Sequence, residues 1–434
     1  MTKPRGGECE AANHEVLISG AGIAGMATAY WLNRYGFRVT VVERAEAPRL
    51  GGYKIDVRGA AVEVLERMAL LGRAREMTTD MQRTSFVDSS GAEVAAMDSD
   101  FAGGRAGADL EVMRGDLNRL LYEETRDTVD YLFGDSVGAI SQNERGVLVT
   151  FEHGGTRRFD LVVGADGQHS NTRADVMGPE SQFIEHLGHY VAIFSTANRL
   201  GLDRAEVIYP RPGRSTLVYR TREDAQARAM LLWASAPLGY DRRDVRRQRE
   251  LIATEFGDEN GWEVPRLLAD VATAPDLYFD SMGLVRVPRW GHGRVVLVGD
   301  AAYGASPASG QGTSLALVGA YVLAGEVCSS PDDLGAAFAR YQAAMATFVE
   351  KNQRLAASNL KGMVMRSRLR IWFQLRALKV LQHLPGKDRV LGRVAAAIHE
   401  AATGITLEDY PVDRMTRPQP TAPPITALPT STQG

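Results

Sequence analysis

The sequence contains few cysteines and has no marked charge imbalance. Its 434 residues include two cysteines, Cys9 and Cys328, too few for a disulfide framework or a cysteine-rich metal cluster. This low cysteine content fits a reducing compartment. Lysine and arginine number 50 against 53 acidic residues, so the formal net charge of −3 gives no electrostatic case for nucleic acid as a partner. The eight histidines show no spacing typical of metal ligands, and we expect no bound metal.

Long hydrophobic runs are also lacking. The N-terminal stretch MTKPRGGECEAANHE is polar and has no apolar core of the kind that a secretion signal contains. The most apolar segment, residues 315–325, is shorter than the roughly 20 residues that cross a membrane. We therefore expect a cytoplasmic protein without a membrane span, present as a monomer or homodimer. The length predicts two domains with additional helices.

A glycine-rich turn, GAGIAG at residues 20–25, follows a short apolar strand at 15–19 and precedes a helix-forming run. In the dinucleotide-binding pattern such glycines make the turn, admit a pyrophosphate at the helix N-terminus and allow close helix–strand packing. An acidic residue ends the next strand about 20 residues further on, where it can bind a ribose hydroxyl. The residues of this predicted nucleotide site are Gly20, Gly22, Ala24, Gly25, Glu43 and Arg44.

A second turn lies in GADGQHSNTR at residues 164–173, after the apolar residues 161–163. Asp166 and Gly167 would turn the chain, and Ser170 and Arg173 would start the next helix. Taken alone, the segment favours an ordinary turn in which an aspartate caps a helix. A role in nucleotide binding is the alternative.

A third turn, GDAAYGASPASGQG at residues 299–312, follows the apolar residues 295–298 and precedes a long apolar helix-forming run. Its aspartate, Asp300, can accept a hydrogen bond from a sugar hydroxyl. Backbone N–H groups at the start of the following helix would point towards a ligand. The candidate residues in the second half of this loop are Pro307, Gly310, Gln311 and Gly312. In the alternative reading, the glycines only turn the chain.

The order of these segments predicts an α/β protein with an inserted sheet. Residues 15–44 form one β-α-β unit, and strand-like segments separated by turns recur between about 180 and 285. We predict a nucleotide-binding domain from residues 1–75, 105–180 and 285–330, and a substrate domain from 76–104 and 181–284. Helices would follow over 331–405. Residues 406–434, rich in Pro, Thr and Ser, would form a disordered tail.

Together the three turns resemble those of the group A FAD-dependent monooxygenases, the para-hydroxybenzoate hydroxylase-like family, over residues 15 to about 325. GGYKIDVRGAAVEVLERMALL (51–71) and MRGDLNRLL (113–121) are most similar to its tetracycline-inactivating and aromatic polyketide hydroxylase branch. The resemblance implies a Rossmann-like FAD-binding domain, an inserted antiparallel β-sheet substrate domain and C-terminal helices. It also implies one extended FAD rather than two nucleotides.

The resemblance further assigns roles to individual residues. The first turn and Glu43 would bind the ADP half of FAD, Arg114 the ribityl–isoalloxazine region, and Asp300 the ribityl or pyrophosphate. Asp166 would support FAD and a transient nicotinamide, and residues 310–312 would lie beside the flavin ring. FAD would be reduced by NADPH or NADH, form a C4a-hydroperoxide with O₂, and pass one oxygen to an aromatic, polycyclic or polyketide-like small molecule.

Two features depart from that family. Tyr303 stands where a histidine usually follows GDAA, so no role of that histidine transfers to this chain. The strand segments VAIFST and AMLLWAS are apolar, which argues against tetracycline as the substrate. The candidate substrate-pocket residues are Phe194, Tyr219 and Trp233 on the inserted strands and Met363, Met365 and Phe373 on the C-terminal helices. Core packing is the alternative for each.

Other activities stay open at this point. The motifs indicate cofactor binding, so a cyclase that uses FAD structurally, or a flavin reductase or oxidase, is compatible with them. A halogenase is disfavoured because no WxWxIP segment occurs. The basic run MRSRLRIWFQLRALK is amphipathic and compatible with a membrane surface, although a solvated face on a packed helix is the favoured interpretation.

Overall fold

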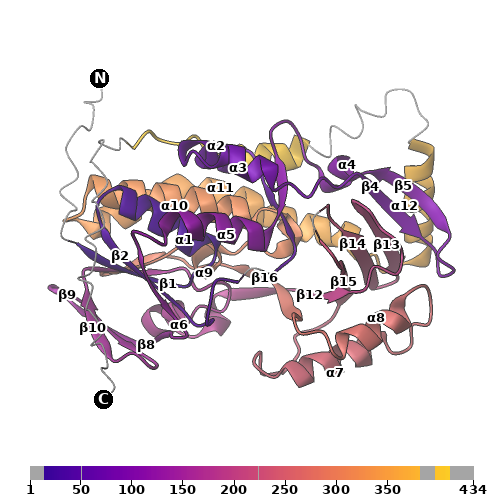
Figure 1. The fold of residues 1–434 in the computed structure, drawn as a ribbon, viewed down its shortest axis with the longest axis horizontal. Coiled ribbons are helices and arrows are strands. Elements are labelled where there is room, and N and C mark those ends of the chain that lie inside the picture. Colours follow the sequence, from indigo (N-terminus) through magenta and orange to yellow (C-terminus); the bar gives the residue numbers. More distant parts are fainter. Residues whose placement is uncertain (1–13, 50, 223, 382–395, 411–434) are drawn as a thin grey trace, which may run out of the picture.

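The computed structural model describes residues 14–49, 51–222, 224–381 and 396–410. Figure 1 shows two sheet-based halves side by side, with long helices lying over one of them. Cys9 and most of the predicted tail lie outside the described residues.

The first half is built on a six-stranded sheet in the order β17-β18-β11-β1-β2-β7. All neighbouring strands in it are parallel except β17 and β18. The strands are β1 (Glu15–Ser19), β2 (Arg38–Glu43), β7 (Asp130–Phe133), β11 (Leu161–Gly164), β17 (Gly291–His292) and β18 (Val295–Leu297). Strands covered on both faces are apolar throughout, which explains why the sequence shows β1, β11 and β18 as unbroken apolar runs.

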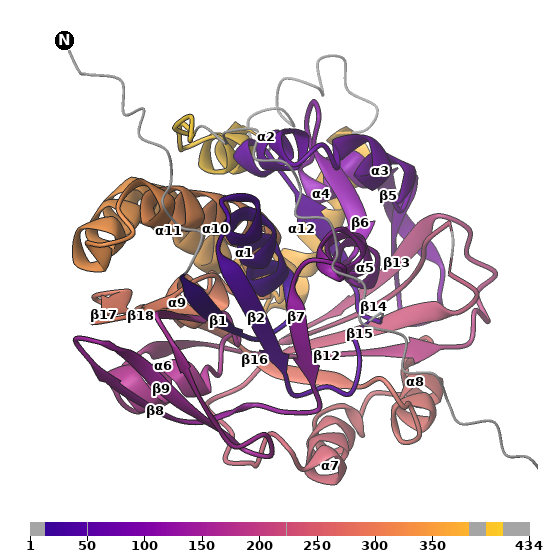
Figure 2. The ribbon, with the colours of Figure 1, turned by 60° about the vertical axis from the view of Figure 1, so that its left-hand side comes forward.

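Helices cover one face of this sheet and a smaller sheet covers the other (Figure 2). The helical layer comprises α1 (Ile23–Arg34), α2 (Ala60–Arg67), α3 (Leu71–Glu76), α5 (Arg114–Thr125), α10 (Gly312–Ser329) and α11 (Leu334–Met363). The opposite layer comprises β8 (Val137–Asn143), β9 (Gly146–Phe151) and β10 (Thr156–Phe159), with α6 (Asn171–Met177) and the 3₁₀ turn Glu180–Gln182 nearby. The helical pattern over residues 60–77 is divided into α2 and α3 because Ala69 adopts a φ of 59°.

The central helix α10 is longer than the sequence predicts. It spans 18 residues and is, within the described part of the chain, the one helix long and apolar enough to cross a membrane. However, 83% of it is buried inside the protein, where it packs between α1 and α11. This burial identifies α10 as a core helix and explains its apolar composition.

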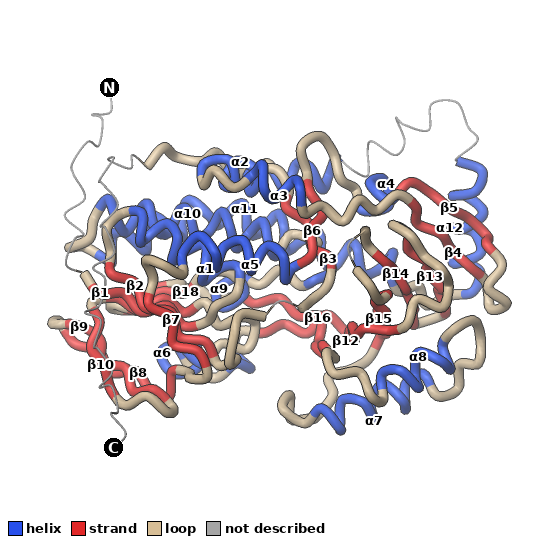
Figure 3. The backbone as a smooth tube through the Cα atoms, viewed as in Figure 1, coloured by secondary structure: helices blue, strands red, loops and turns tan. Residues whose placement is uncertain are grey.

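The second half contains a seven-stranded sheet in the order β16-β12-β15-β14-β13-β4-β5 (Figure 3). Its strands are antiparallel except for the pair β13 and β4. They are β4 (Arg83–Val87), β5 (Glu93–Asp98), β12 (Ile184–Thr196), β13 (Ala205–Arg211), β14 (Arg214–Arg220), β15 (Ala227–Ala234) and β16 (Tyr278–Val285). The predicted strand-like segments therefore lie in one sheet, as expected.

Short elements connect the two halves. The two-stranded sheet of β3 (Lys54–Val57) and β6 (Leu110–Met113) lies between them. The helices around the second half are α4 (Ser99–Gly103), α7 (Val245–Phe256), α8 (Val264–Val271) and α12 (Arg368–Leu381). The loop after β18 contains α9 (Asp300–Tyr303) and the 3₁₀ turn Pro307–Ser309.

Candidate functional site

Three loops meet at the carboxyl ends of adjacent parallel strands β1, β11 and β18. A Cβ atom on Gly20, after β1, would lie 2.7 Å from the carbonyl oxygen of Ala165, after β11. A Cβ atom on Gly299, after β18, would lie 2.7 Å from the Cβ of Ala24 in α1. The strand order reverses between β1 and β11, and ligands of open α/β sheets bind outside the strand ends at such a point. The three motifs therefore belong to one site.

The N-terminus of α1 is prepared for an anion. Its N-cap residue is Gly22, so no side chain accepts a hydrogen bond from the N–H groups of the first turn, and that turn contains no acidic residue that would repel an anion. Glu43 fixes the loop between β1 and α1, because its carboxylate accepts hydrogen bonds from the N–H groups of Ala21 at 2.9 Å and Ala45 at 3.0 Å. Gly25 must be a glycine, since a Cβ there would collide with the carbonyl oxygen of Gly20. Arg44 follows Glu43 and is exposed.

Arg114 and Asp300 approach the site from different loops. Arg114 begins α5; its N–H donates to the Tyr53 carbonyl at 3.0 Å, and its guanidinium lies 6.0 Å from the centre of the Tyr53 ring. Burial opposes the Arg114 charge, but Tyr53, Tyr278 and Asp300 raise its pKa above the ordinary value. Burial also raises the pKa of the Asp300 carboxyl, Arg114 opposes this, and Asp280 adds to it.

The loop at residues 306–312 brings backbone close to Asp300. A Cβ on Gly312 would lie 4.0 Å from the Asp300 carboxylate, and Gly310 has a φ of +66°. Gln311 is the N-cap of α10 and gives it no side-chain cap. Its side-chain amide is fully buried, and neither the nitrogen nor the oxygen has a hydrogen-bond partner within the described chain. Pro307 starts the 3₁₀ turn and is exposed.

The second motif is bonded within itself and to the third motif. Both carboxylate oxygens of Asp166 accept hydrogen bonds from residues that start α6, Ser170 and Thr172. Arg173 is fully buried and donates to the carbonyl oxygens of Ala301 at 2.9 Å and Gln168 at 2.7 Å. The N-cap of α6 is Ser170, and Asp166 supports it and the first turn of the helix. Arg173 ties the loop after β11 to the loop after β18. Gly167, with a φ of +85°, completes the turn.

Tyr303 faces the core and not the site. Its side chain is 1% exposed, and its hydroxyl is hydrogen-bonded to that of Tyr341 at 2.8 Å. The ring lies 4.5 Å from the ring of Trp290, and its hydroxyl occupies the space that a Cβ on Gly319 would need. Tyr303 therefore fixes α9 against α10 and α11.

The residues present fit FAD. Uncapped helix N-termini at α1 and α10 suit a pyrophosphate and the polar edge of a flavin ring. A buried, unpartnered amide at Gln311 supplies a donor and an acceptor that the described protein does not use. Arg114 and Asp300 add a cation and a hydrogen-bond acceptor to the same group of loops.

The seven-stranded sheet has two apolar faces with different neighbours. On one face, Phe194 and Trp233 pack with Ile252 and Phe256 of α7. Both side chains are 1% exposed. The structure thus corrects the predicted placement of Phe194 and Trp233, which fill this core and do not reach the other face. Alternation along a strand sends neighbouring side chains to opposite faces.

The other face is turned towards the loop after β18. Val191 and Ile193 on this face pack with Ala308 of the loop after β18. Tyr219, also on this face, is fully buried, and its hydroxyl accepts a hydrogen bond from the N–H of Lys54 at 3.2 Å. Lys54 also pairs with Glu206 of β13 at 2.7 Å. Tyr219 therefore joins β3 to the sheet.

Sequence reasoning missed the side chains that are open to solvent on this face. The strand register puts Ile208, Leu217 and Met230 in one row across β13, β14 and β15. All three are half-buried. Tyr278 of β16 is also half-buried, and its ring lies 5.5 Å from the ring of Tyr53. The strand alternation indicates these two faces, but both are apolar, so the pattern alone does not select one.

The candidate substrate-pocket residues on the C-terminal helices lie in different environments. Met363 ends α11 and is 39% exposed, whereas Met365 is buried with Ile371 and Leu375. Phe373 lies on α12 and is 67% exposed. The structure thus corrects the placement of Met365, which is a core residue, and of Phe373, which lies away from the sheet against which α12 packs.

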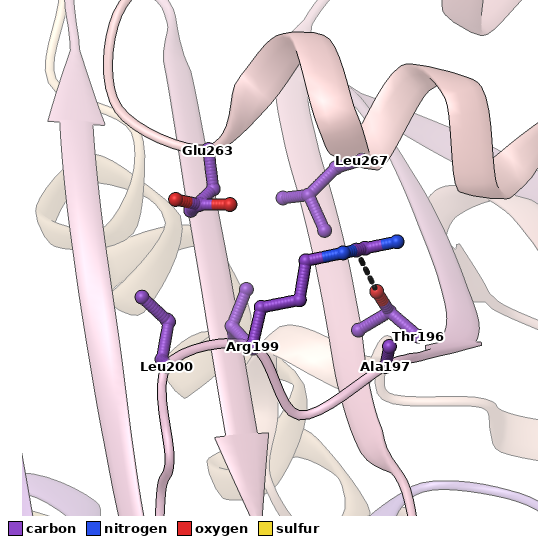
Figure 4. A pocket seen from close by; sticks show the side chains of 7 residues that line it. Thr196, Ala197, Arg199, Leu200, Glu263 and Leu267 are labelled. Atoms are coloured by element: carbon purple, nitrogen blue, oxygen red, sulfur yellow. Dashed lines mark hydrogen bonds between the residues drawn. The ribbon is translucent and has the colours of Figure 1, made fainter.

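A small pocket elsewhere does not compete with this site (Figure 4). It has a volume of about 10 Å³ and lies between the end of β12 and α8, space for about one water molecule. Arg199 in its wall is bound to Asp270 at 2.6 Å and contacts Thr196 at 3.4 Å. Among the residues that the structure describes, no group of three His, Cys, Asp or Glu side chains is placed to hold a metal ion.

Comparison with known proteins identifies the family. Residues 13–329 match the family described as FAD binding domain. An uncharacterised protein of Mycobacterium tuberculosis is 46% identical over 349 residues, which cover 80% of this chain and 94% of that protein. A flavin-dependent monooxygenase of Legionella longbeachae is 36% identical over 342 residues, covering 79% of this chain and 87% of that protein.

The fold comparison agrees with the sequence comparison. The crystal structure of the tetracycline destructase Tet(51) superposes with a TM-score of 0.79 at 32% identity, covering 92% of this chain and all of that chain. The resemblance to group A flavoprotein monooxygenases, predicted from the three motifs, is confirmed. The chain belongs to the FAD binding domain family and is a FAD-dependent monooxygenase.

Proposed function

We propose that the enzyme consumes NADPH or NADH and O₂ to insert one oxygen atom into an aromatic, polycyclic or polyketide-like small molecule. The second oxygen atom leaves as water, and the nicotinamide supplies the two electrons. Bound FAD supplies the electron transfer and the activation of O₂, and the protein supplies binding, orientation and exclusion of water.

The proposed cofactor site runs along the three loops. Residues 20–25 with Glu43 and Arg44 hold the ADP half, and the N-terminus of α1 faces the pyrophosphate. Arg114 and Asp300 contact the middle of the cofactor. Residues 310–312 would lie beside the flavin ring. The N–H groups of Gly310 and Gln311 already donate to the Pro307 carbonyl and the Ser309 hydroxyl, so the N–H of Gly312 and the uncapped N-terminus of α10 would favour negative charge there.

The observation that carries the substrate class is the half-buried apolar row of Ile208, Leu217 and Met230. This row lies on the face of the sheet directed towards the cofactor loops, and Tyr278 extends it with an aromatic ring. Such a surface suits a flat apolar molecule and excludes water from the reaction. Tet(51) is named a tetracycline destructase, but a densely hydroxylated molecule would leave many polar groups unpaired against this row.

The proposal also divides the chain between cofactor and substrate. We assign the cofactor to a domain of residues 1–75, 105–180 and 285–330, and the substrate to residues 76–104 and 181–284. The nicotinamide binds transiently, because the sequence contains one dinucleotide-binding glycine turn.

Oxidation of NADPH and NADH by the purified holoenzyme tests the proposal. A panel of polycyclic phenols, with tetracycline included, is added under air and under argon. We expect a compound that accelerates nicotinamide oxidation under air and gains one oxygen atom from ¹⁸O₂. Product without nicotinamide consumption would indicate a cyclase instead, and consumption with hydrogen peroxide as the only product would indicate an oxidase.

A further inference from the structure

Helix α12 has an apolar stripe that the structure leaves uncovered. Its inner side, Ile371 and Leu375, packs with Phe86 and Val94 of the neighbouring strands β4 and β5. With 3.6 residues per turn, a second apolar set falls on the opposite side of the helix. The exposed fractions of this outer stripe are 73% for Leu369, 52% for Trp372, 67% for Phe373 and 57% for Val380.

The outer stripe is accompanied by positive charge. Residues 364–381 contain no acidic side chain, and their basic residues are Arg366, Arg368, Arg370, Arg376 and Lys379. Within the described chain, none of these four arginines forms an ion pair with a carboxylate. Arg376 instead lies 5.1 Å from the centre of the Trp372 ring.

The position of α12 makes this surface accessible. The helix lies at the edge of the molecule, beside β5, the last strand of the seven-stranded sheet (Figure 1). A protein surface in water rarely exposes four large apolar side chains on one helix side unless they have a binding role.

The positive charge beside the outer stripe indicates which kind of partner binds it. A second copy of this chain packed about a two-fold axis would bring the same cations face to face. The undescribed segments 382–395 and 411–434 are themselves net positive, so neither supplies a complementary charge. An anionic bilayer satisfies both features, because aromatic and aliphatic side chains enter the headgroup boundary while arginines contact lipid phosphates. We propose that α12 docks the enzyme onto a membrane surface rich in anionic lipids.

Vesicle flotation of the full-length holoenzyme tests the proposal. The probes are phosphatidylcholine vesicles with and without phosphatidylglycerol. We expect the protein to float with the anionic vesicles, to remain behind with pure phosphatidylcholine, and to be released by high salt. Trp372 reports insertion directly, because Trp31, Trp233 and Trp290 are buried and Trp262 is half-buried. Its emission should shift to the blue on anionic vesicles, and Trp372→Phe should remove that shift.

Double variants separate the electrostatic contribution to membrane binding from the apolar contribution. R368Q/R370Q should weaken binding about 30-fold, from the usual contribution of two surface cations. L369S/F373S should abolish binding. R243Q/R246Q, with one residue just before α7 and one in its first turn, serves as a control with the same loss of charge. All three should keep the wild-type FAD content and melting temperature, because the replaced side chains are exposed.

Three results would overturn the proposal. One is binding that is absent or independent of anionic lipid, and another is an equal loss of binding in the α7 control. The third is a Trp372 that is shielded from a soluble quencher without lipid. If this shielding grew with protein concentration, a second copy would be the occupant; if it persisted in a dilute monomer, another segment of the chain would be.

Discussion

Gly22→Ala is the most informative substitution at the site, because we expect it to weaken FAD binding without changing the stability of the fold. Its Cβ would have no heavy atom within 4 Å, and the φ of −81° suits any residue. Alanine is a poorer N-cap than glycine by a few tenths to about 1 kcal/mol. Against this, replacing glycine reduces the entropy of the unfolded chain by about 0.4–1 kcal/mol. These effects oppose each other, so the unfolding free energy of the apoprotein should change by less than about 0.5 kcal/mol.

Cofactor affinity should respond strongly to the same change. The added methyl group would hold the pyrophosphate away from the N–H groups of the first turn of α1. Losing one hydrogen bond to a charged group costs about 1.5–3 kcal/mol, which raises the Kd for FAD about 10- to 100-fold. Quenching of flavin fluorescence during titration of the apoprotein measures this Kd, and urea unfolding measures stability.

Two matched variants complete the experiment. Gly72→Ala lies in α3, where a Cβ also meets nothing within 4 Å, and it should leave FAD binding unchanged. Gly25→Ala should destabilise even the apoprotein, because its Cβ collides with the Gly20 carbonyl oxygen. If Gly22→Ala bound FAD as tightly as the wild type, the placement of the pyrophosphate at α1 would be refuted.

Four further substitutions test other parts of the account. Asp300→Asn should stabilise the apoprotein at neutral pH. Folding raises the pKa of the Asp300 carboxyl, so the free energy of unfolding of the wild type falls as pH rises above 3.8, the pKa of this carboxyl in the unfolded chain. Urea unfolding across pH should show this dependence in the wild type and its loss in the variant. Hydrogen bonds to Asp280 and Glu180 outweigh burial and raise the pKa of His169, so its stabilisation is complete below about pH 6.5 and lost as pH rises through the folded value. His169→Gln should remove this dependence, and a variant that retained it would contradict the assignment. Met230→Ala should raise the KM for substrate with little loss of stability. Trp233→Phe should lower the free energy of unfolding by more than about 1 kcal/mol without changing that KM. The reverse pattern would show that the substrate binds on the face of the sheet that packs against α7.

The cofactor half of the fold was predictable because its signals are local. A buried parallel strand, a glycine turn and a helix start follow one another within a few residues, at residues 15–25 and again near Asp300. Parallel strands end at the same sheet edge, so loops distant in sequence come together. The clash at Gly25 shows why that glycine stands there.

The half built on the seven-stranded sheet was less predictable because its signals are not local. Along β12 both alternating sets are apolar, so the sequence does not show that Phe194 faces α7 while Ile193 faces the cofactor loops. That choice depends on which helices cover the sheet. Tyr278 contacts Tyr53 from a strand far away in the sequence, and the separate motifs give no sign of this contact.

A crystal structure of the FAD-bound enzyme tests the central claim most directly. The account predicts a single extended FAD with its pyrophosphate at the N-terminus of α1 and its flavin ring beside residues 310–312. It also predicts that Arg114 and Asp300 contact the atoms between these ends. An FAD whose pyrophosphate lies away from α1, or a second nucleotide occupying the loop after β18, would contradict it.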